Sequence, residues 1–340
     1  MILITGGAGF IGSCLQERLF AQNRQTIVAD WLGGGASSAL STGQAQPGRW
    51  RNLAAHPPLE VVAPEALSTW LERAPALRAV VHLGAISETT AKDGDLVWRT
   101  NVALPQQLWR WCARARVPFI YASSAATYGS AVNDFRDGLE GLERLRPTSL
   151  YGWSKQAFDL WVCQALERGH PSPPQWAGLK FFNVYGPNEY HKGAMMSVIK
   201  VKYDELAAGR PLTLFKSDDP SVADGQQKRD FIWVGDCVDV VLWLLRNPHV
   251  CGLFNCGTGQ ARSYSDLARA VCQAADRPEA ITYVPMPQRL QGQYQYYTQA
   301  NMDALREAGY QAPFTPLEEG VRRYVQSYLM QAGPAGPRTL

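Results

Sequence analysis

Two residues of the segment YGWSK, Tyr151 and Lys155, are spaced for proton transfer. They are four residues apart in a predicted helix, so their side chains lie on the same face. A tyrosine hydroxyl has an ordinary pKa of about 10, so it acts as a base near neutral pH only when a cation stabilises its phenolate. Lys155 supplies that cation, and Ser124, just past a predicted strand, could hydrogen-bond the same substrate oxygen. Taken alone the spacing is common, and a surface Tyr and Lys pair is the alternative.

A glycine-rich segment near the N-terminus, TGGAGFIG, predicts where a dinucleotide binds. Gly6, Gly9 and Gly12 follow a predicted strand directly and open a predicted helix. Glycine permits a tight turn there and lets a pyrophosphate approach the backbone amides of the helix N-terminus. The combination predicts a nicotinamide cofactor, whose oxidised ring would also stabilise a tyrosine phenolate.

The second strand ends at Asp30, where a carboxylate would accept hydrogen bonds from the adenosine ribose. The alternative is an ordinary turn aspartate. Asp30 alone favours NAD over NADP. Arg49 and Arg51 follow shortly, however, and either could neutralise a 2′-phosphate, which favours NADP and leaves NAD open.

The first half of the chain alternates short apolar strands with amphipathic helices, which predicts an α/β fold with a doubly wound parallel Rossmann sheet. A smaller, discontinuous C-terminal substrate-binding domain is expected to follow. The expected strands are 2–5, 26–30, 59–62, 79–84, 118–123 and 176–182, and the expected helices are 10–21, 97–115 and 150–168.

The domain boundaries follow from the loosening of this pattern after residue 183. Residues 1–175 are predicted to bind the cofactor, with DFIWVGD and GLFNCGTG, near 229–258, returning to the sheet. Residues 176–330 form the substrate-binding domain, with a helix near 195–208, a strand at 212–215 and helices near 303 and at 317–329. Residues 33–48 are predicted to be a flexible surface loop, and 331–340 a flexible tail.

Composition excludes several functional classes. The chain of 340 residues is 46% hydrophobic and 19% charged, and no apolar run approaches the ~18 residues of a membrane span. The first residues read as strand and turn rather than as a signal peptide, so we expect a cytoplasmic enzyme without a membrane partner. The net charge of +3 is interspersed, which argues against nucleic acid.

Cysteine and histidine spacing predicts no metal site. The seven cysteines are scattered and lack CxxC pairs, so we expect reduced, mostly buried thiols. His191 has no second histidine or cysteine at ligand spacing, and we expect it to form structural hydrogen bonds.

The order TGGAGFIG, YASSAATYG, YGWSK resembles the extended short-chain dehydrogenase/reductase superfamily, whose members act on nucleotide-linked sugars. Its dehydratases carry an Asp-Glu pair directly after the active-site serine or threonine, where this chain has Ala125 and Ala126. The chain therefore lacks the acid and the base that dehydration requires. Nearly the whole chain is more closely similar to the ADP-L-glycero-D-manno-heptose 6-epimerase family, through FFNVYGPNEYHKG, KRDFIWVGD, FNCGTG and QGQYQYYTQAN.

This resemblance implies an isomerase that inverts C6 of an ADP-linked heptose. The secondary alcohol is oxidised to a transient ketone, and hydride then returns to the opposite face from one tightly bound NADP per subunit. A single fixed base is poorly placed for both epimers, so Tyr151 and Lys192 would each serve one of them. Lys192 can do so only if its surroundings depress its pKa. The alternative for Lys192 is a cation that contacts the substrate diphosphate.

The resemblance also implies which residues hold the two ligands. Arg229 would bind the diphosphate with bidentate geometry, whereas its alternative role is an ion pair with Asp230 or another surface acid. The alternative for Tyr294 is packing among neighbouring tyrosines. Those implied for the cofactor are Gly6, Gly9, Phe10, Ile11, Gly12, Asp30, Trp31, Arg49, Leu83, Gly84, Ala85, Ile86, Ser87, Asn101, Lys155, Val184 and Lys192. Those implied for the substrate are Ser124, Asn183, Ala194, Phe215, Lys216, Ser217, Asp218, Arg229 and Tyr294.

The chain departs from the family's pattern at two places. Ala194 stands where the family often has a substrate-touching serine, and Arg49 stands for its usual phosphate-binding lysine, after a longer loop. The resemblance further implies a homo-oligomer, typically a homopentamer, and a role in lipopolysaccharide core biosynthesis. Two alternatives remain: another nucleotide-sugar epimerase or reductase, and a non-enzymatic cofactor-sensing scaffold, which the presence of Tyr151, Lys155 and Ser124 disfavours.

Overall fold

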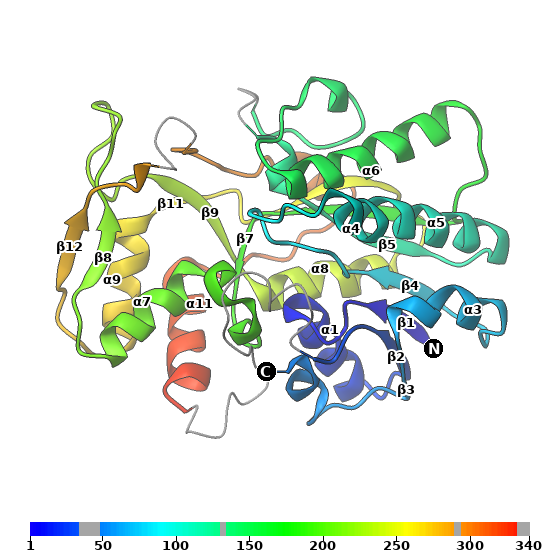
Figure 1. Cartoon of the computed structure of the whole chain (residues 1–340), viewed down its shortest axis with the longest axis horizontal. Helices are drawn as coiled ribbons and strands as arrows, with labels where there is room; N and C mark the ends of the chain where they lie inside the picture. Colours follow the sequence, from blue (N-terminus) through cyan, green and yellow to red (C-terminus); the bar gives the residue numbers. More distant parts are fainter. Residues whose placement is uncertain (34–47, 130–133, 289–293, 332–340) are drawn as a thin grey trace.

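A seven-stranded parallel sheet forms the centre of the larger part of the protein (Figure 1). The computed structural model describes residues 1–33, 48–129, 134–288 and 294–331. Strand order is β10-β6-β5-β4-β1-β2-β3, the doubly wound arrangement expected from the sequence. The strands are β1 (Ile2–Thr5), β2 (Thr26–Ala29), β3 (Glu60–Val62), β4 (Ala79–His82), β5 (Phe119–Ser124), β6 (Trp176–Phe181) and β10 (Gly252–Cys256).

Helices cover both faces of this sheet, which explains why its inner strands are continuous apolar runs rather than alternating ones. Helices α1 (Phe10–Ala21) and α8 (Val234–Arg246) pack together on one face, through residues such as Leu15 and Val238. Helices α3 (Leu67–Glu72), α5 (Leu104–Ala115) and α6 (Leu150–Glu167) pack on the other, through residues such as Leu108 and Phe158.

The predicted helix 97–115 is confirmed as a helical stretch, but it is not uniform. It consists of α4 (Gly94–Trp98), a π-helical turn (Arg99–Ala103) and α5. Asp93 caps the start, since its carboxylate accepts the Leu96 amide at 2.9 Å. The π-helical turn carries the buried Asn101. Turns of this type are frequent at functional positions.

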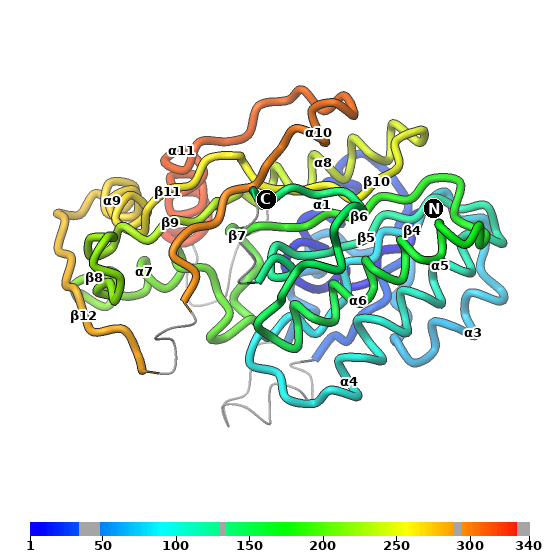
Figure 2. The backbone as a smooth tube through the Cα atoms, turned by 90° about the horizontal axis from the view of Figure 1, so that it is seen from above, coloured from blue at the N-terminus to red at the C-terminus, as the bar shows by residue number. Residues whose placement is uncertain are grey.

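A smaller part of the protein is built around two further sheets, shown beside the large sheet in Figure 2. One contains β7 (Asn183–Tyr185), β9 (Lys228–Trp233) and β11 (Ala261–Ser263), and the other contains β8 (Leu212–Phe215) and β12 (Ile281–Val284). The helices of this part are α7 (Val198–Ala207), α9 (Tyr264–Ala274) and α11 (Leu317–Tyr324), which a π-helical turn (Val325–Leu329) continues. Helix α10 (Asp303–Glu307) lies instead against β10 of the large sheet.

The expectation that DFIWVGD returns to the large sheet is wrong. Its strand, β9, pairs in parallel with β7 and antiparallel with β11, whereas β10 of GLFNCGTG does pair with β6. A short apolar run indicates burial but does not select the partner strand. The division into a cofactor-binding and a discontinuous substrate-binding domain stays a prediction.

Two other predicted features lie almost entirely outside the described residues: the loop at 33–48 and the tail at 331–340.

Within the described residues, no helix has the length and apolar character needed to cross a bilayer. Those residues also contain no group of three or more His, Cys, Asp or Glu side chains that could hold a metal ion. The cysteines are free and, apart from Cys163 and Cys251, buried.

Candidate active site

A cavity of about 1310 Å³ runs along the carboxyl ends of the large sheet's strands. This is the edge at which open α/β sheets bind their ligands. The walls come from both parts of the protein, because residues after β1, β2, β4 and β5 face the segment 181–199. Predicted residues in the walls are Gly6, Gly9, Phe10, Ile11, Gly12, Asp30, Trp31, Arg49, Leu83, Gly84, Ala85, Ile86, Ser87, Ser124, Tyr151, Lys155, Asn183, Val184, Lys192, Ala194 and Arg229.

The glycine-rich turn after β1 forms a cradle that side chains would fill. A Cβ added to Gly12 would lie 2.1 Å from the Gly6 carbonyl oxygen, and Gly6 itself has φ of 70°. Helix α1 begins directly after Gly9, and no side chain caps its first amides. Free amides at a helix N-terminus attract a phosphate, so the turn fits the pyrophosphate of a dinucleotide.

Asp30 lies at the end of β2, in the wall beside this turn. Its carboxylate accepts the amides of Ala8 at 2.9 Å and Trp31 at 2.8 Å, and the Arg49 guanidinium lies 3.4 Å away. Burial raises the pKa of Asp30, while Arg49 and the amides act in the opposite direction. A fixed carboxylate and a cation therefore stand together where an adenosine ribose would lie. Arg51 contacts the exposed Trp50 ring instead.

The segment after β4, residues 83–87, lines the cavity and is held from behind by Asn101. The Asn101 side chain donates to the Ile86 carbonyl and accepts the Ile86 amide, both at 2.9 Å, and also bonds Ser154 of α6 at 3.0 Å. Asn101 is 1% exposed and is absent from the cavity wall. Its two bonds to Ile86 hold the segment in place, and its predicted contact with the cofactor stays a prediction.

Ser124, Tyr151 and Lys155 meet in the cavity wall, as the sequence predicted. The Lys155 ammonium donates to the Ala122 carbonyl at 2.8 Å. Burial lowers the pKa of Lys155 to about 8, while Asp159 acts to raise it. Burial also raises the pKa of the Tyr151 hydroxyl, and its hydrogen bond with Ser124 lowers it. Tyr151 and Ser124 are thus hydrogen-bonded across α6 and the end of β5, and Lys155 lies in the same wall.

Lys192 reaches the same cavity from the other part of the protein. Its ammonium lies 5.3 Å from the centroid of the Phe10 ring, next to the glycine-rich turn. Burial lowers the pKa of Lys192, and the negative charge of Glu189 opposes that shift. An amine with a depressed pKa can exist in both protonation states, which is the condition for acid/base work.

The loop that carries Lys192 is fixed by the buried Glu189. Its carboxylate accepts the amide of Ser197 and, at 2.6 Å, the Ser197 hydroxyl. It also accepts the Tyr324 hydroxyl of α11 at 2.9 Å. Both ends of the loop are thereby joined. His191, expected to form structural hydrogen bonds, lines the cavity and has a hydrogen bond with the Asn188 backbone, while burial lowers its pKa to about 3.

The predicted substrate residues are only partly brought together. Arg229 is 7% exposed, donates to the Lys228 carbonyl at 2.8 Å and lies 5.1 Å from the Tyr294 ring. No ion pair in the described residues involves Arg229, and Asp230 instead accepts from Thr258. The structure leaves five predicted residues out of the cavity wall: Phe215, Lys216, Ser217, Asp218 and Tyr294.

Sequence reasoning missed other residues of the wall. Glu65 accepts the Trp31 indole N–H at 2.7 Å, and Met195 lies 3.9 Å from the Thr89 hydroxyl across the cavity. No spacing rule in the sequence marks these positions, because they come from loops whose paths only the fold decides. A further missed feature, the buried pair Asp159 and Lys180, did leave a signal: a lysine within an otherwise apolar strand.

The fold and the site together define a class: a protein with a doubly wound parallel sheet and a cavity that fits a dinucleotide at its carboxyl edge, with a tyrosine, a lysine and a serine in one wall. A sequence model of the NAD dependent epimerase/dehydratase family matches residues 2–257. The ADP-L-glycero-D-manno-heptose-6-epimerase of Nitratidesulfovibrio vulgaris strain DP4 is 44% identical, over 98% of this chain and 99% of its own. That of Fusobacterium nucleatum is 39% identical, over 97% and 98%.

The chain thus belongs to the NAD dependent epimerase/dehydratase family and, within it, to the ADP-L-glycero-D-manno-heptose-6-epimerases. Among solved structures, the enzyme of that name from Helicobacter pylori has a TM-score of 0.77 at 27% identity, covering 96% of this chain and 95% of its own. A UDP-glucose 4-epimerase from Thermus thermophilus, in complex with NAD, has a TM-score of 0.69 at 24% identity, covering 95% and 97%, and shares the fold.

Proposed function

We propose that this protein interconverts ADP-D-glycero-D-manno-heptose and ADP-L-glycero-D-manno-heptose by inverting C6. The observation that carries the proposal is that Tyr151 and Lys192 line one cavity from opposite parts of the protein. Inversion requires proton handling for an alcohol presented in two orientations, and two separate groups meet that need. A bound nicotinamide would supply the acceptance of hydride from C6 and its return to the other face.

Tyr151, Lys155 and Ser124 form the first acid/base unit. The Tyr151 hydroxyl moves the proton of the C6 hydroxyl, and the Lys155 ammonium stabilises the phenolate by its charge. The Ser124 hydroxyl, hydrogen-bonded to Tyr151, orients the same substrate oxygen. Ala125 and Ala126, which follow Ser124, have no acid or base, so elimination across two sugar carbons has no proton donor there.

Lys192 forms the second unit and handles the proton of the other epimer. A direct test replaces it by methionine, which keeps the length of the side chain but removes the amine. A base removed in this way lowers kcat, by about 10²-fold or more, whereas loss of a diphosphate anchor chiefly raises KM. Tyr151→Phe is the matched variant on the opposite side. Lys192→Met with full turnover at saturation would remove this residue from the chemistry.

We infer that NADP is the preferred cofactor, one per subunit. Support comes from Arg49, whose guanidinium lies in the cavity wall beside Asp30. A guanidinium binds a 2′-phosphate through charge-assisted hydrogen bonds, while Asp30 would accept from a ribose hydroxyl and so accommodate NAD. Mass spectrometry of the native protein reads the retained cofactor directly. Recovery of NAD alone would reject the preference.

Arg229, Asn183 and Ala194 are proposed to contact the nucleotide sugar, since all three line the cavity. The guanidinium of Arg229 would bind the diphosphate, and the neighbouring Tyr294 ring limits its movement. We also infer a homo-oligomer, with five subunits as the expected number for this family. The same native mass measurement gives the subunit count.

The assay for the proposed function supplies ADP-D-glycero-D-manno-heptose to the purified protein without added cofactor. The expected result is conversion to the L-glycero epimer with no net change in NADPH absorbance. A related reductase would act on the sugar only after NADPH is added and would consume it stoichiometrically, and a cofactor-sensing scaffold would leave the sugar unchanged. Either outcome would refute the proposal.

A further inference from the structure

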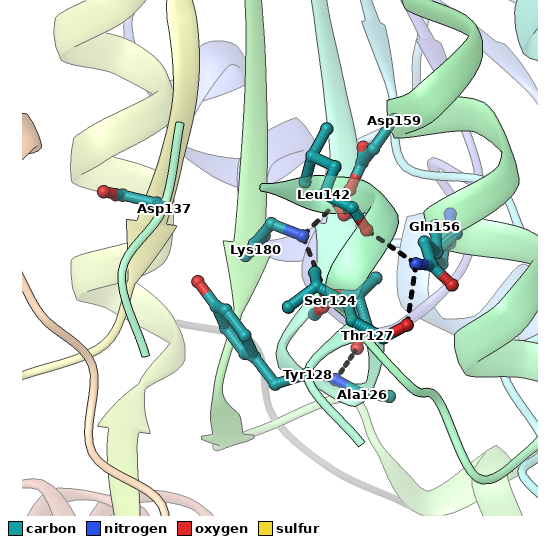
Figure 3. A network of polar contacts seen from close by, with 12 residues as sticks. Ser124, Ala126, Thr127, Tyr128, Asp137, Leu142, Gln156, Asp159 and Lys180 are labelled. Carbon is teal, nitrogen blue, oxygen red and sulfur yellow. Dashed lines mark hydrogen bonds and ion pairs between the residues drawn. The ribbon is translucent and has the colours of Figure 1, made fainter. Parts of the chain in front are cut away.

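A buried ion pair, Lys180 with Asp159, lies beside the turn that carries Ser124 and Thr127 (Figure 3). The Lys180 ammonium of β6 lies 3.0 Å from the Asp159 carboxylate of α6, and both side chains have an exposed fraction of 0%. Apolar residues of similar volume can often replace such a pair without loss of stability. Stability alone is therefore a weak reason for its presence, and its position next to the active site becomes the more informative observation.

Both charges are held in place by further hydrogen bonds. The Asp159 carboxylate also accepts the Ser123 hydroxyl at 2.6 Å and the Tyr121 hydroxyl at 3.2 Å, both from β5. The Lys180 ammonium donates to the Thr127 hydroxyl at 2.7 Å and lies 5.1 Å from the Tyr128 ring centroid. The pair is thus a fixed element of the fold with a defined orientation.

The pair connects to each member of the catalytic set. Tyr151, Lys155 and Asp159 follow one another at intervals of four along α6 and so share a face of the helix. Thr127, which accepts from the pair, donates to the Ser124 carbonyl at 2.8 Å. The Asp159 charge acts to raise the pKa of both Lys155 and Tyr151. Lys180 carries the opposite charge at the same place.

We propose that Asp159 and Lys180 are positioning residues: a charge-compensated pair that sets the protonation of Tyr151 and Lys155 and holds the turn that carries Ser124. The inference rests on the proposed function and deepens it. Removing one charge should displace the proton equilibrium of the tyrosine, and removing both should restore it. A pair that served only to stabilise the fold would show neither effect.

Other titratable groups lie beside the pair or beside Lys155, and they remain in place in the test. His82 of β4 hydrogen-bonds Thr5 at 2.6 Å, and burial together with the charge of Lys155 lowers the pKa of His82 to about 3, so it stays neutral. Tyr121 and Tyr128 have pKa values raised by burial. Asp137 bonds the Asn255 amide, and burial raises its pKa while Lys180 lowers it.

The test begins with Asp159→Asn, which removes the charge and keeps the shape. The asparagine carbonyl can accept from Ser123 and Lys180, which share one carboxylate oxygen, and its amide can donate to Tyr121, which bonds the other oxygen. Without the negative charge, the nearby ammonium favours the phenolate. Two helical turns separate Tyr151 from residue 159, about 12 Å, so the expected displacement is about one pH unit at an effective dielectric constant of about 20.

The readout is the pH profile of kcat for epimerisation, measured with the cofactor-loaded protein. Each limb of this profile reports the pKa of one acid/base group. In Asp159→Asn the limb set by Tyr151 should move to lower pH, whereas the limb set by Lys192, which lies on a separate loop, should stay in place. In the double variant Asp159→Asn with Lys180→Met, the Tyr151 limb returns to its wild-type position. Tyr121→Phe is the matched control, because it removes a hydrogen bond to the same carboxylate but no charge, and its limbs should not move.

Three results would overturn the inference. They are an Asp159→Asn profile with neither limb displaced, an inactive Asp159→Asn protein that keeps the wild-type Tm and cofactor content, and a double variant whose Tyr151 limb differs from wild type. If Asp159→Asn fails to fold, Lys180→Met takes its place: the unpaired Asp159 charge should move the Tyr151 limb to higher pH, and an unmoved limb in the folded protein would overturn the inference. Failure of the proposed function is distinguishable, because it appears as a wild-type protein that does not epimerise the ADP-heptose.

Discussion

Gly152, between Tyr151 and Trp153, sets the distance between helix α6 and the turn that carries Ser124. A Cβ built at this position lies 2.5 Å from the carbonyl oxygen of Ala126 and 3.1 Å from its carbonyl carbon. The Gly152 amide also donates to the Ser149 hydroxyl at 3.1 Å, in the cap of the helix. The substitution Gly152→Ala therefore forces a methyl group against backbone that cannot rotate away.

The size of the effect follows from that distance. An ordinary contact begins at about 3.4 Å, so helix and turn must separate by about 0.9 Å. Overpacking of this kind costs about 1–3 kcal/mol of stability. A displacement of about 1 Å between reacting groups lowers turnover by about 10²-fold. Because Tyr151 hydrogen-bonds Ser124 across this interface, the loss should fall mainly on kcat, with KM changing less than about threefold.

The assay compares kcat, KM and Tm of Gly152→Ala with those of Gly94→Ala. Gly94 also lies in the first turn of a helix, α4, but a Cβ there meets no atom within 4 Å. The control should keep wild-type turnover and gain up to about 1 kcal/mol from the better helix propensity of alanine. Both proteins should retain their cofactor, since neither residue lines the cavity.

A Gly152→Ala protein with wild-type kcat would refute the reasoning. It would mean that the interface between α6 and the Ser124 turn absorbs the methyl group without moving the catalytic groups. A raised KM with unchanged kcat would point to substrate binding instead, and would equally contradict a role in holding Tyr151 against Ser124.

Three further predictions concern residues that line or support the cavity. Glu189→Gln removes the negative charge that raises the pKa of Lys192, so that pKa should fall. The limb of the kcat–pH profile that belongs to Lys192 should then move to lower pH. A limb that stays or moves to higher pH would contradict the interaction between Glu189 and Lys192. Arg49→Ala weakens NADP binding, measured by calorimetry, about 10- to 100-fold but NAD binding less than about threefold, and equal losses would argue against a phosphate contact. Asn101→Ala leaves the amide and the carbonyl of Ile86 without their side-chain partner. The free energy of unfolding, measured by chemical denaturation, should fall by about 1–3 kcal/mol. An unchanged value would show that water replaces the side chain.

The sequence predicted the cofactor half of the fold well because its signals are local. The glycine-rich turn, the helix at Phe10–Ala21 and the strands of the large sheet are each encoded by a short run of residues and its flanks. Ser124, Tyr151 and Lys155 could also be placed together, because parallel strands end at the same edge of a sheet and helical spacing is regular.

The remaining features depend on long-range pairing. β7 has three residues, too few for a periodic pattern, and its pairing with β9 could not be inferred from either segment. That pairing removes β9 from the large sheet and directs Arg229 into the cavity. Phe215, in β8, belongs instead to a two-stranded sheet outside the cavity wall. Such outcomes depend on which surfaces meet and are not written in any one window of the sequence.

The bond between Tyr324 and Glu189 has a consequence for how the enzyme matures. During synthesis the dinucleotide cradle emerges from the ribosome early, and all of its residues are out well before α11 exists. The loop of Lys192, in contrast, lacks one of its anchors until a residue 135 positions later has been translated and its helix has docked. A nascent chain can therefore complete its dinucleotide cradle first and the anchoring of the Lys192 loop last, so that, under the mechanism proposed above, a chain that has bound its cofactor but lacks α11 could not yet finish the inversion.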